Sequence, residues 1–235
     1  MDSNAVTTLQ NSLLAELATF KKYRDTALKA QDPEGVHQLR VSLRRMRSAL
    51  IVFRPLIKPD YRRRWGKKLK RLARQLDEAR DLDVLLLTHF NDDSTNPDLH
   101  QSLLKKQKQV YQQLNRSLRS SRFKKPIRQL KKQLKKANWS DKYCRHRHMT
   151  LSELARLRLE TLYGRVIEQQ QAMDLTDETA LHQLRIRFKQ LRYGCDFLSP
   201  VLDSQQNAVF IASINVLQDL LGDIHDASVH QDMLH

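Results

Sequence analysis

Cysteine, glycine and proline are scarce in this chain of 235 residues, which has two cysteines, five glycines and six prolines. Cys144 and Cys195 lie far apart and outside any CxxC spacing, which argues against a disulfide scaffold and against a zinc site. We expect Cys195 to be a small core residue. Because glycine and proline are few, the chain has few residues that favour tight turns, whereas helix-forming residues are plentiful. The composition therefore predicts an all-α protein.

Long apolar runs are absent as well. No run approaches the roughly 20 residues needed to span a bilayer, and residues 1–4 lack the basic and apolar segments of a leader. We therefore expect a cytoplasmic protein with no membrane partner. The sequence also lacks a glycine-rich phosphate loop, a nucleophile elbow and an HExxH motif. It predicts no catalytic residue, no metal ligand and no cofactor, and hence a protein that is not an enzyme.

Basic residues are present in large excess: 42 lysines and arginines oppose 26 acidic residues, a net charge of +16. Such a charge attracts polyanions, which include nucleic acid, anionic lipid and free phosphate polymers. Residues 100–147 contain sixteen basic residues and one acid, Asp141, so nearly the whole excess is local. The sequence leaves open whether this stretch is a second polyanion surface or only keeps the protein in solution.

Apolar residues recur at helical spacing along most of the chain. Helices are predicted over about 4–30, 34–54, from 59, over 97–120, from Pro126, over 149–172 and over 177–198. Pro126 fits the first turn of its helix, where its missing N–H costs no hydrogen bond. Between the helices we expect an acidic turn at 77–83, one or two helical turns up to 90, a polar loop at 91–96 and a linker at 138–141.

One predicted helix carries an apolar face and a basic face side by side. At 100° per residue, Val36, Leu39 and Leu43 fill one arc, and the adjoining arc holds His37, Arg40, Arg44 and Arg47. A later helix repeats this basic pattern as His182, Arg185, Lys189 and Arg192. The helix from Pro59 has a second basic face with Lys67, Lys70 and Arg74.

The two motif helices belong to a longer duplication. His37 and His182 are 145 residues apart, and the same offset relates Asp81 to Asp226. A constant offset over the motif helix, the helix break, the next helix and the acidic turn indicates a duplicated three-helix unit. We therefore predict two antiparallel helical-bundle repeats related by pseudo-two-fold symmetry, at about 4–137 and about 141–235.

The doubled His-x-x-Arg-x-x-x-Arg/Lys-x-x-Arg helix, each copy followed by an acidic turn, resembles the CHAD domain (conserved histidine α-helical domain) over about residues 5–235. The resemblance implies two four-helix bundles that bind inorganic polyphosphate through histidine, arginine and lysine, without catalysis, and recruitment to polyphosphate granules. Some members of the family accompany a triphosphate-hydrolysing tunnel domain. This chain has no acidic, strand-rich segment of that kind.

Carried over position by position, the resemblance implies polyphosphate-binding residues in both halves. They are His37, Arg40, Arg44, Arg47, Lys67, Lys70 and Arg74 in the first half, and His182, Arg185, Lys189 and Arg192 in the second. The counterparts of Lys67, Lys70 and Arg74 are Ala212, Asn215 and Asp219, so we expect the first half to contribute more of the binding. We also expect bound polyanion to raise the pKa of both histidines, so that binding tightens as the pH falls through about 6.5.

Other interpretations stay open. A charged helix face is often only solvated, and a histidine is often a packed core residue. The same cations would hold the phosphates of nucleic acid weakly, although aromatic residues make up only 6% of the chain and do not interleave with the basic faces. His225-Asp226 resembles the dyad of metal-dependent HD phosphohydrolases, but its counterpart is Arg80-Asp81. We expect Asp81 and Asp226 to cap helices or to pair with arginines.

Overall fold

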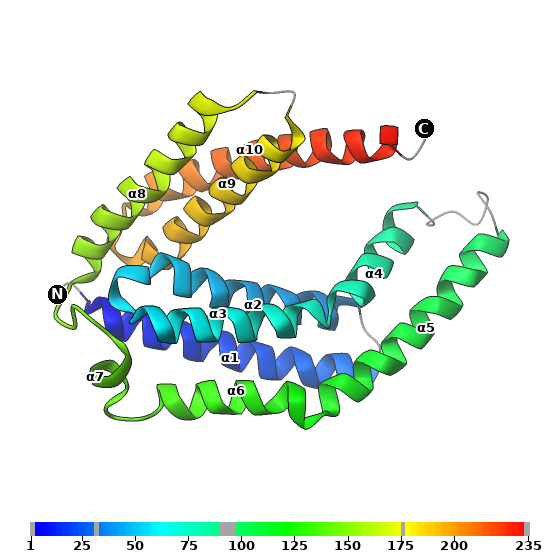
Figure 1. The fold of residues 1–235 in the computed structure, drawn as a ribbon, viewed down its shortest axis with the longest axis horizontal. Helices are drawn as coiled ribbons and strands as arrows, with labels where there is room; N and C mark the ends of the chain where they lie inside the picture. Colours follow the sequence, from blue (N-terminus) through cyan, green and yellow to red (C-terminus); the bar gives the residue numbers. More distant parts are fainter. Residues whose placement is uncertain (1–2, 31–32, 90–96, 175–176, 233–235) are drawn as a thin grey trace. The chain divides into compact units, whose positions relative to one another are not determined.

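Every regular element of this computed structural model is a helix, which confirms the predicted all-α class (Figure 1). The structure describes residues 3–30, 33–89, 97–174 and 177–232, with side chains excepted at 29–30, 89 and 223–232. The predicted loop at 91–96 lies outside these residues. No helix in the described part of the chain is long and apolar enough to cross a membrane. The elements are α1 (Ala5–Ala30), α2 (Pro33–Val52), η1 (Arg54–Leu56), α3 (Pro59–Arg74), α4 (Asp77–His89), α5 (Pro97–Arg119), α6 (Ser121–Leu134), α7 (Trp139–Tyr143), α8 (Leu151–Ala172), α9 (Glu178–Leu198), η2 (Ser199–Val201) and α10 (Ser204–Asp232).

The chain forms two compact units. Unit 1 comprises Met1–Thr8, Ile51–Leu56 and His146–His235, and unit 2 comprises Leu9–Leu50 and Ile57–Arg145. The predicted boundaries at about 4–137 and 141–235 divide the chain by repeat, and they stay a prediction.

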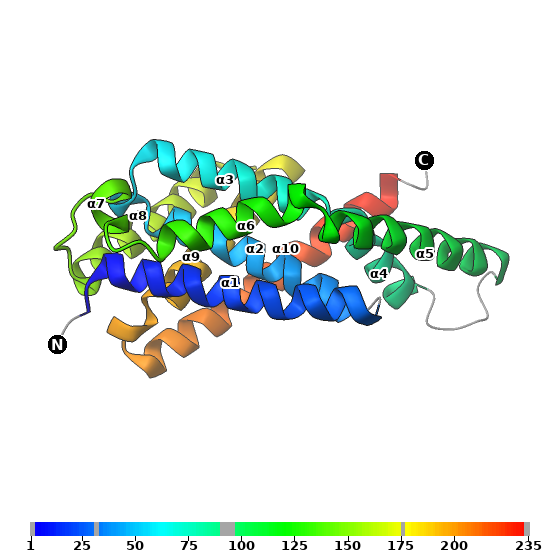
Figure 2. The same ribbon diagram turned by 90° about the horizontal axis from the view of Figure 1, so that it is seen from below.

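In unit 2, α6 packs against both α1 and α3, and Figure 2 draws it between these two helices. On the α1 side, the rings of Phe20 and Phe123 stack with centroids 5.8 Å apart. On the α3 side, Trp65 donates a hydrogen bond from Nε1 to the side-chain oxygen of Gln133, at 3.2 Å. The core of the unit is built from residues that are almost fully buried: Leu9, Leu13, Leu39, Leu43, Met46, Leu69, Leu72, Phe123 and Leu130.

The acidic segment after α3 is a helix of 13 residues, α4, where we expected a turn and then one or two helical turns. Acidic side chains in a first turn favour a helix, because they face the positive end of its dipole, and Asp77 and Glu78 occupy that turn. Asp83 is buried and ties α4 to α5. It accepts hydrogen bonds from the amide of Gln107, at 2.8 Å, and from the hydroxyl of Tyr111, at 2.7 Å.

The prediction that Pro126 occupies a first helical turn is wrong. α6 begins at Ser121, because the Ser120 hydroxyl accepts a hydrogen bond from the backbone N–H of Phe123 and caps the helix. Pro126 lies inside the helix, so the carbonyl four residues earlier lacks one helical hydrogen bond. Pro126 is buried, as are Leu130 and Leu134, which were expected to face inward.

The predicted linker at 138–141 is also wrong in part, because α7 begins at Trp139. Trp139 is buried and donates a hydrogen bond from Nε1 to the hydroxyl of Tyr61 on α3, at 3.1 Å. Burial of this large ring against Tyr61 supplies the tertiary packing that such a short helix needs. Periodicity cannot reveal a helix of five residues.

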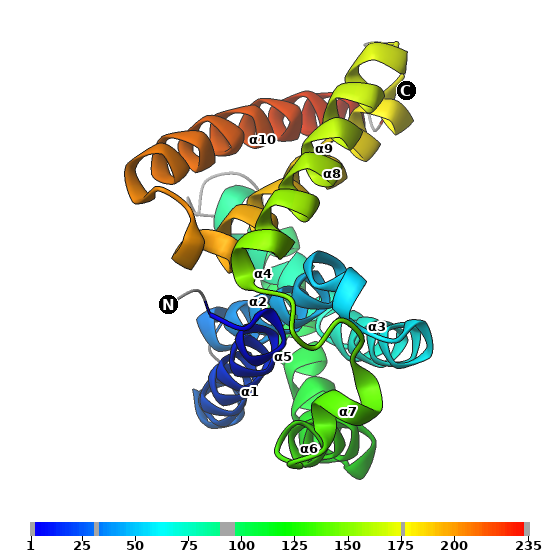
Figure 3. The ribbon, with the colours of Figure 1, turned by 90° about the vertical axis from the view of Figure 1, so that its left-hand side faces the viewer.

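In unit 1, α8 and α10 both pack along α9 (Figure 3). Thr150 caps α8 through a capping box with Glu153. Arg158 of α8 is buried and donates hydrogen bonds to the carbonyls of Val52, at 2.7 Å, and Ile51, at 3.1 Å, in the last turn of α2. Burial lowers the pKa of Arg158 to about 10, with smaller contributions from nearby arginines, so it remains a cation at neutral pH.

The two cysteines are buried and not joined to each other. Burial raises the pKa of Cys144 to about 12 and that of Cys195 to about 11, so both thiols stay protonated at neutral pH. The expectation that Cys195 is a core residue is confirmed.

The helix boundaries follow the predicted repeat. α9, η2 and α10 begin 145 residues after α2, η1 and α3, respectively. The pattern differs at one point, because α10 continues through the positions that correspond to the break between α3 and α4. The two-fold relation between the repeats stays a prediction.

Candidate functional site

A cationic cavity of about 180 Å³ lies in unit 2. Its lining includes Asp77, at the start of α4, and five basic side chains that the sequence analysis proposed as binding residues. They are Arg40, Arg44 and Arg47 from α2, and Lys70 and Arg74 from α3. We call these five residues the cation cluster. The structure therefore brings the basic face of the motif helix together with part of the basic face of α3.

Burial of the apolar faces of α2 and α3 orients the basic faces that carry the cation cluster. Val36, Leu39 and Leu43 of α2 are completely buried, which turns the adjoining arc of α2 toward the edge of the core. Leu69 and Leu72 are buried in the same way on α3. Within the cation cluster, Arg44, Lys70 and Arg74 are exposed, whereas Arg40 and Arg47 are half-buried.

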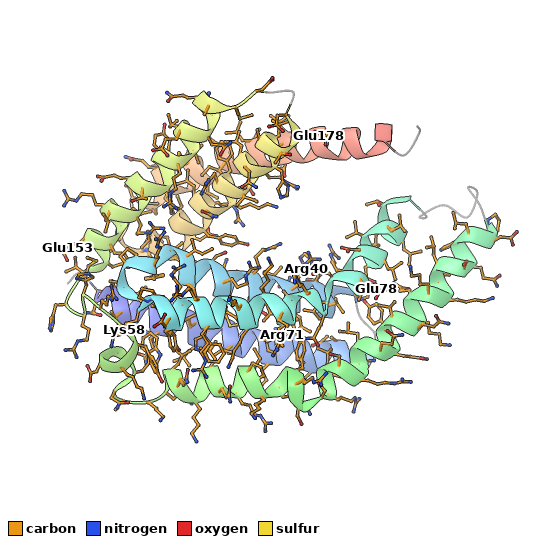
Figure 4. All side chains as sticks on the ribbon, viewed as in Figure 1. Arg40, Lys58, Arg71, Glu78, Glu153 and Glu178 are labelled. Atoms are coloured by element: carbon orange, nitrogen blue, oxygen red, sulfur yellow. The ribbon has the colours of Figure 1, made fainter. Side chains whose placement is uncertain are left out.

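Arg40 is held by two carboxylates of α4. Its Nη2 lies 3.5 Å from Oδ1 of Asp77, and its Nη1 lies 3.6 Å from Oδ1 of Asp81. Figure 4 labels Arg40 on α2 and Glu78 of the same acidic turn on α4. These distances are long for charged hydrogen bonds, and all three side chains are at least a third exposed, so the pairs orient Arg40 with little gain in stability.

The expected pairing of Asp81 with an arginine is thus confirmed, whereas Asp81 does not cap α4, which begins at Asp77. The side chain of Asp226 lies outside the described residues.

Positive charge is crowded around Arg47. Burial lowers the pKa of Arg47, Arg74 lowers it further, and Asp77 offsets part of this. An arginine stays charged under these conditions. An anionic ligand beside Arg47 would favour its charged form and offset the repulsion by Arg74.

His37 lies one turn before Arg40 on α2 and is half-buried. Burial lowers its pKa most, and Arg80 of α4, then Arg44 and Arg40 lower it further, while Glu34 raises it. The ring is therefore mainly neutral at pH 7. Arg80 was not named as a site residue, because it comes near His37 only from α4, and the sequence analysis expected a turn at the start of α4.

Two predicted residues stand apart from the cavity. His37 and Lys67 do not line it, although His37 is within electrostatic reach of Arg40 and Arg44. Lys67 is exposed on α3, one turn before Lys70.

The four predicted residues of the second half lie on α9 in unit 1. Nη1 of Arg192 pairs with Oδ2 of Asp196 at 3.4 Å, and its guanidinium lies over the ring of Tyr193. Arg185 lies against Gly222 of α10, and Nε of Arg185 is shielded from solvent with no hydrogen-bond partner among the described residues. His182 is exposed and Lys189 is half-buried.

Charge divides sharply between the units. Unit 2 has 33 lysines and arginines against 13 acidic residues, a net charge of +20, whereas unit 1 has 9 against 13, a net charge of −4. The excess that the sequence shows as a whole therefore belongs to unit 2. The expectation that the first half contributes more of the binding stays a prediction.

A match to a protein-family model identifies the family of this chain. The model of the CHAD domain matches residues 11–235. The chain belongs to the CHAD domain family. This CHAD chain shares its fold with the crystal structure of the CHAD domain from the plant Ricinus communis, at a TM-score of 0.83 and 22% identity, over 99% of this chain and 78% of that one.

A second solved structure, PptA from Streptomyces chartreusis, matches this CHAD chain with a TM-score of 0.61 and 16% identity, over 97% of each chain. The comparison with curated proteins gave no match. At these identities the solved structures show the fold of the CHAD chain alone.

No group of three or more His, Cys, Asp or Glu side chains in the described part of the chain could hold a metal ion. The side chains of His225 and Asp226 fall outside that part.

Proposed function

We propose that this CHAD domain binds inorganic polyphosphate through the cation cluster of unit 2, without a catalytic step. The observation that carries the proposal is that five cations from two helices line one cavity of about 180 Å³. Membership of the CHAD family supports it, because polyphosphate binding through histidine, arginine and lysine is what the resemblance implies. On this proposal the protein would be recruited to polyphosphate granules.

The geometry of α2 suits a linear polyanion. Arg40, Arg44 and Arg47 span about 10 Å along the helix axis, at 1.5 Å per residue, and Lys70 and Arg74 face the same cavity from α3. A chain of phosphates would place successive anionic oxygens along this row. Each guanidinium can take two oxygens at once, and Lys70 adds point charge.

The other predicted residues have secondary roles in this proposal. Lys67 would extend the row along α3, and His37 would join when protonated. On α9, His182, Arg185, Lys189 and Arg192 would form a weaker second contact, because Arg192 already pairs with Asp196 and unit 1 carries a net charge of −4.

A triple variant, Arg44→Ala/Lys70→Ala/Arg74→Ala, tests the site, because these three cations are exposed and their removal should not disturb the core. We expect the affinity for long-chain polyphosphate to fall by at least about tenfold, since the variant cannot form three charge-assisted hydrogen bonds to phosphate. The slope of log affinity against log salt concentration should become shallower by about 0.7 for each phosphate that is no longer neutralised.

The matched control removes the same charge elsewhere on unit 2: Lys125→Ala/Arg128→Ala/Lys132→Ala on α6, all exposed. We expect this control to change the affinity by less than about threefold, through long-range attraction alone. An equal fall in affinity in the two triple variants would mean that charge is spread without a site, and it would contradict the proposal.

Competition distinguishes polyphosphate from nucleic acid, which remains the alternative ligand. At equal phosphate concentration and moderate salt, long-chain polyphosphate should displace labelled DNA or RNA from the protein. Preferential retention of the nucleic acid would favour the alternative. Release of orthophosphate from polyphosphate with added divalent metal would contradict the non-catalytic part of the proposal.

A further inference from the structure

Unit 2 has another cavity, of about 290 Å³, between α1 and α6. Its lining consists of four apolar side chains, which include Phe20 of α1 and Ile127 of α6, and five basic side chains, with no acidic residue among them. None of these residues lines the cavity of the cation cluster. The cavity between α1 and α6 is therefore a separate site.

The cavity has an apolar floor and a basic rim. The rings of Phe20 and Phe123, which stack with centroids 5.8 Å apart, are almost completely buried, and Ile127 beside them is half-buried. Lys21 follows Phe20 on α1, and Lys131 lies one helical turn after Ile127 on α6, and both lysines are exposed. An apolar floor with cations at its edge suits a ligand that has an apolar part and an anionic part.

Arg24 of α1 lines the cavity and has an unsatisfied donor. Its Nε is shielded from solvent and has no hydrogen-bond partner among the described residues, while its Nη2 lies 3.3 Å from Oδ1 of Asp25. Asp25 does not line the cavity. A shielded donor without an acceptor costs free energy. An anionic ligand that contacts Arg24 would supply the missing acceptor.

The dimensions of the cavity fit a small ligand with a short chain. The lining residues of α1 run from Leu17 to Arg24, which is roughly 10 Å along the helix axis at 1.5 Å per residue. An extended chain advances roughly 1.2 Å per bond, so about eight carbons cover this length. The volume of about 290 Å³ lies near the lower limit of small-molecule pockets, about 300 Å³.

We propose that the cavity between α1 and α6 binds a small anionic amphiphile, an alkyl chain of about eight carbons that carries a phosphate head group. The chain would lie along the floor, on Phe20 and Ile127. Arg24 and Lys124, which are half-buried beside the floor, would bind the head group. Five cations without an acid favour a phosphate monoester, whose charge at pH 7 is close to −2, over a carboxylate.

This ligand differs from the one under the proposed function. Inorganic polyphosphate has no apolar part that could use the floor of the cavity, and the cation cluster contributes no residue to this site. The proposal therefore does not depend on polyphosphate binding.

Isothermal titration calorimetry of the full chain with octyl phosphate tests the proposal, at about 0.15 M salt and below the concentration at which octyl phosphate forms micelles. We expect saturable binding. The affinity should rise two- to fourfold for each methylene between butyl and octyl phosphate, and it should level off in longer chains, once the cavity is filled. Inorganic phosphate lacks the chain and octyl glucoside lacks the charge, so each should bind at least about tenfold more weakly than octyl phosphate.

The double variant Arg24→Gln/Lys124→Gln should weaken the binding of octyl phosphate by about tenfold or more, because the head group loses two charge-assisted hydrogen bonds. The matched control is Lys22→Gln/Lys125→Gln, which removes the same charge from exposed neighbours on the same two helices that do not line the cavity. This control should leave the affinity within about twofold. Thermal unfolding of both variants verifies that they fold.

An equal loss of affinity in the two double variants, or an affinity that does not depend on chain length, would overturn the proposal. Binding that the triple variant of the cation cluster abolishes and Arg24→Gln/Lys124→Gln does not weaken would also overturn it, because the amphiphile would then occupy the polyphosphate cavity. Binding to vesicles of anionic lipid without binding of monomeric octyl phosphate would overturn it as well, since the ligand would then be a membrane surface.

Discussion

Three arginines of this chain have different roles, and their nearest neighbours decide which. Arg158 is buried and donates to two backbone carbonyls. Arg40 is half-buried and held loosely by Asp77 and Asp81. Arg44 is exposed and lines the cationic cavity. An arginine whose donors are already satisfied has little to offer a ligand, so Arg44 is the best placed of the three to bind an anion.

His37 should make polyphosphate binding depend on pH. In the free protein, burial and Arg80 hold the pKa of His37 below its ordinary value. A phosphate oxygen beside the ring favours the imidazolium form and raises the pKa in the complex. Because the ring then takes up a proton on binding, the affinity should rise as the pH falls through the pKa of the complex and level off below the lowered pKa of the free protein.

Titration calorimetry between about pH 5.5 and pH 8 measures this effect. We expect His37→Ala to flatten the pH dependence, and the double variant with His182→Ala to flatten it at least as much. The control His148→Ala, at an exposed position, should retain the dependence. An unaltered pH dependence in the double variant would remove both histidines from the site.

At the scale of the elements, the spacing of apolar residues predicts those helices that form because one apolar face is buried. The motif helix and α3 were predicted within two residues of their starts, because their apolar faces, with Leu39, Leu43 and Leu69, bury completely. The start of α6 and the existence of α7 were missed. Those depend on a serine cap and on Trp139 meeting Tyr61, and neither leaves a periodic signal.

The same distinction applies to the candidate site. Arg40, Arg44 and Arg47 could be grouped from one helix alone, because they share a face of α2. Asp77 and Arg80 could not be added, since they reach the site only when α4 packs near α2. Lys67 shares a face with Lys70 and Arg74, yet it does not line the cavity, because helical periodicity does not report where a cavity ends.

The end of α2 should depend on Arg158. Replacing Arg158 with methionine keeps the apolar stem but leaves the carbonyls of Ile51 and Val52 without their charged donor. We expect the free energy of unfolding to fall by about 3 kcal/mol, measured by denaturant unfolding. Arg156→Met, an exposed neighbour on α8, should change it by less than about 0.5 kcal/mol. Equal effects of the two substitutions would show that the hydrogen bonds to the carbonyls contribute nothing.

At the scale of the whole molecule, the two units differ in charge and in their cavities. Unit 2 has a net charge of +20 and a cationic cavity, whereas unit 1 has a net charge of −4 and a cavity lined mainly by apolar residues. Duplicated sequences thus support two different surfaces. On the proposed function, unit 2 is the unit that binds a phosphate polymer.

A crystal structure of the protein with a short polyphosphate such as tripolyphosphate tests the central claim most directly. We predict phosphate density in the cavity of unit 2, with oxygens within hydrogen-bonding distance, about 3 Å, of Arg44, Lys70 and Arg74. Phosphates bound only along residues 100–147, or only on the basic face of α9, would contradict the account.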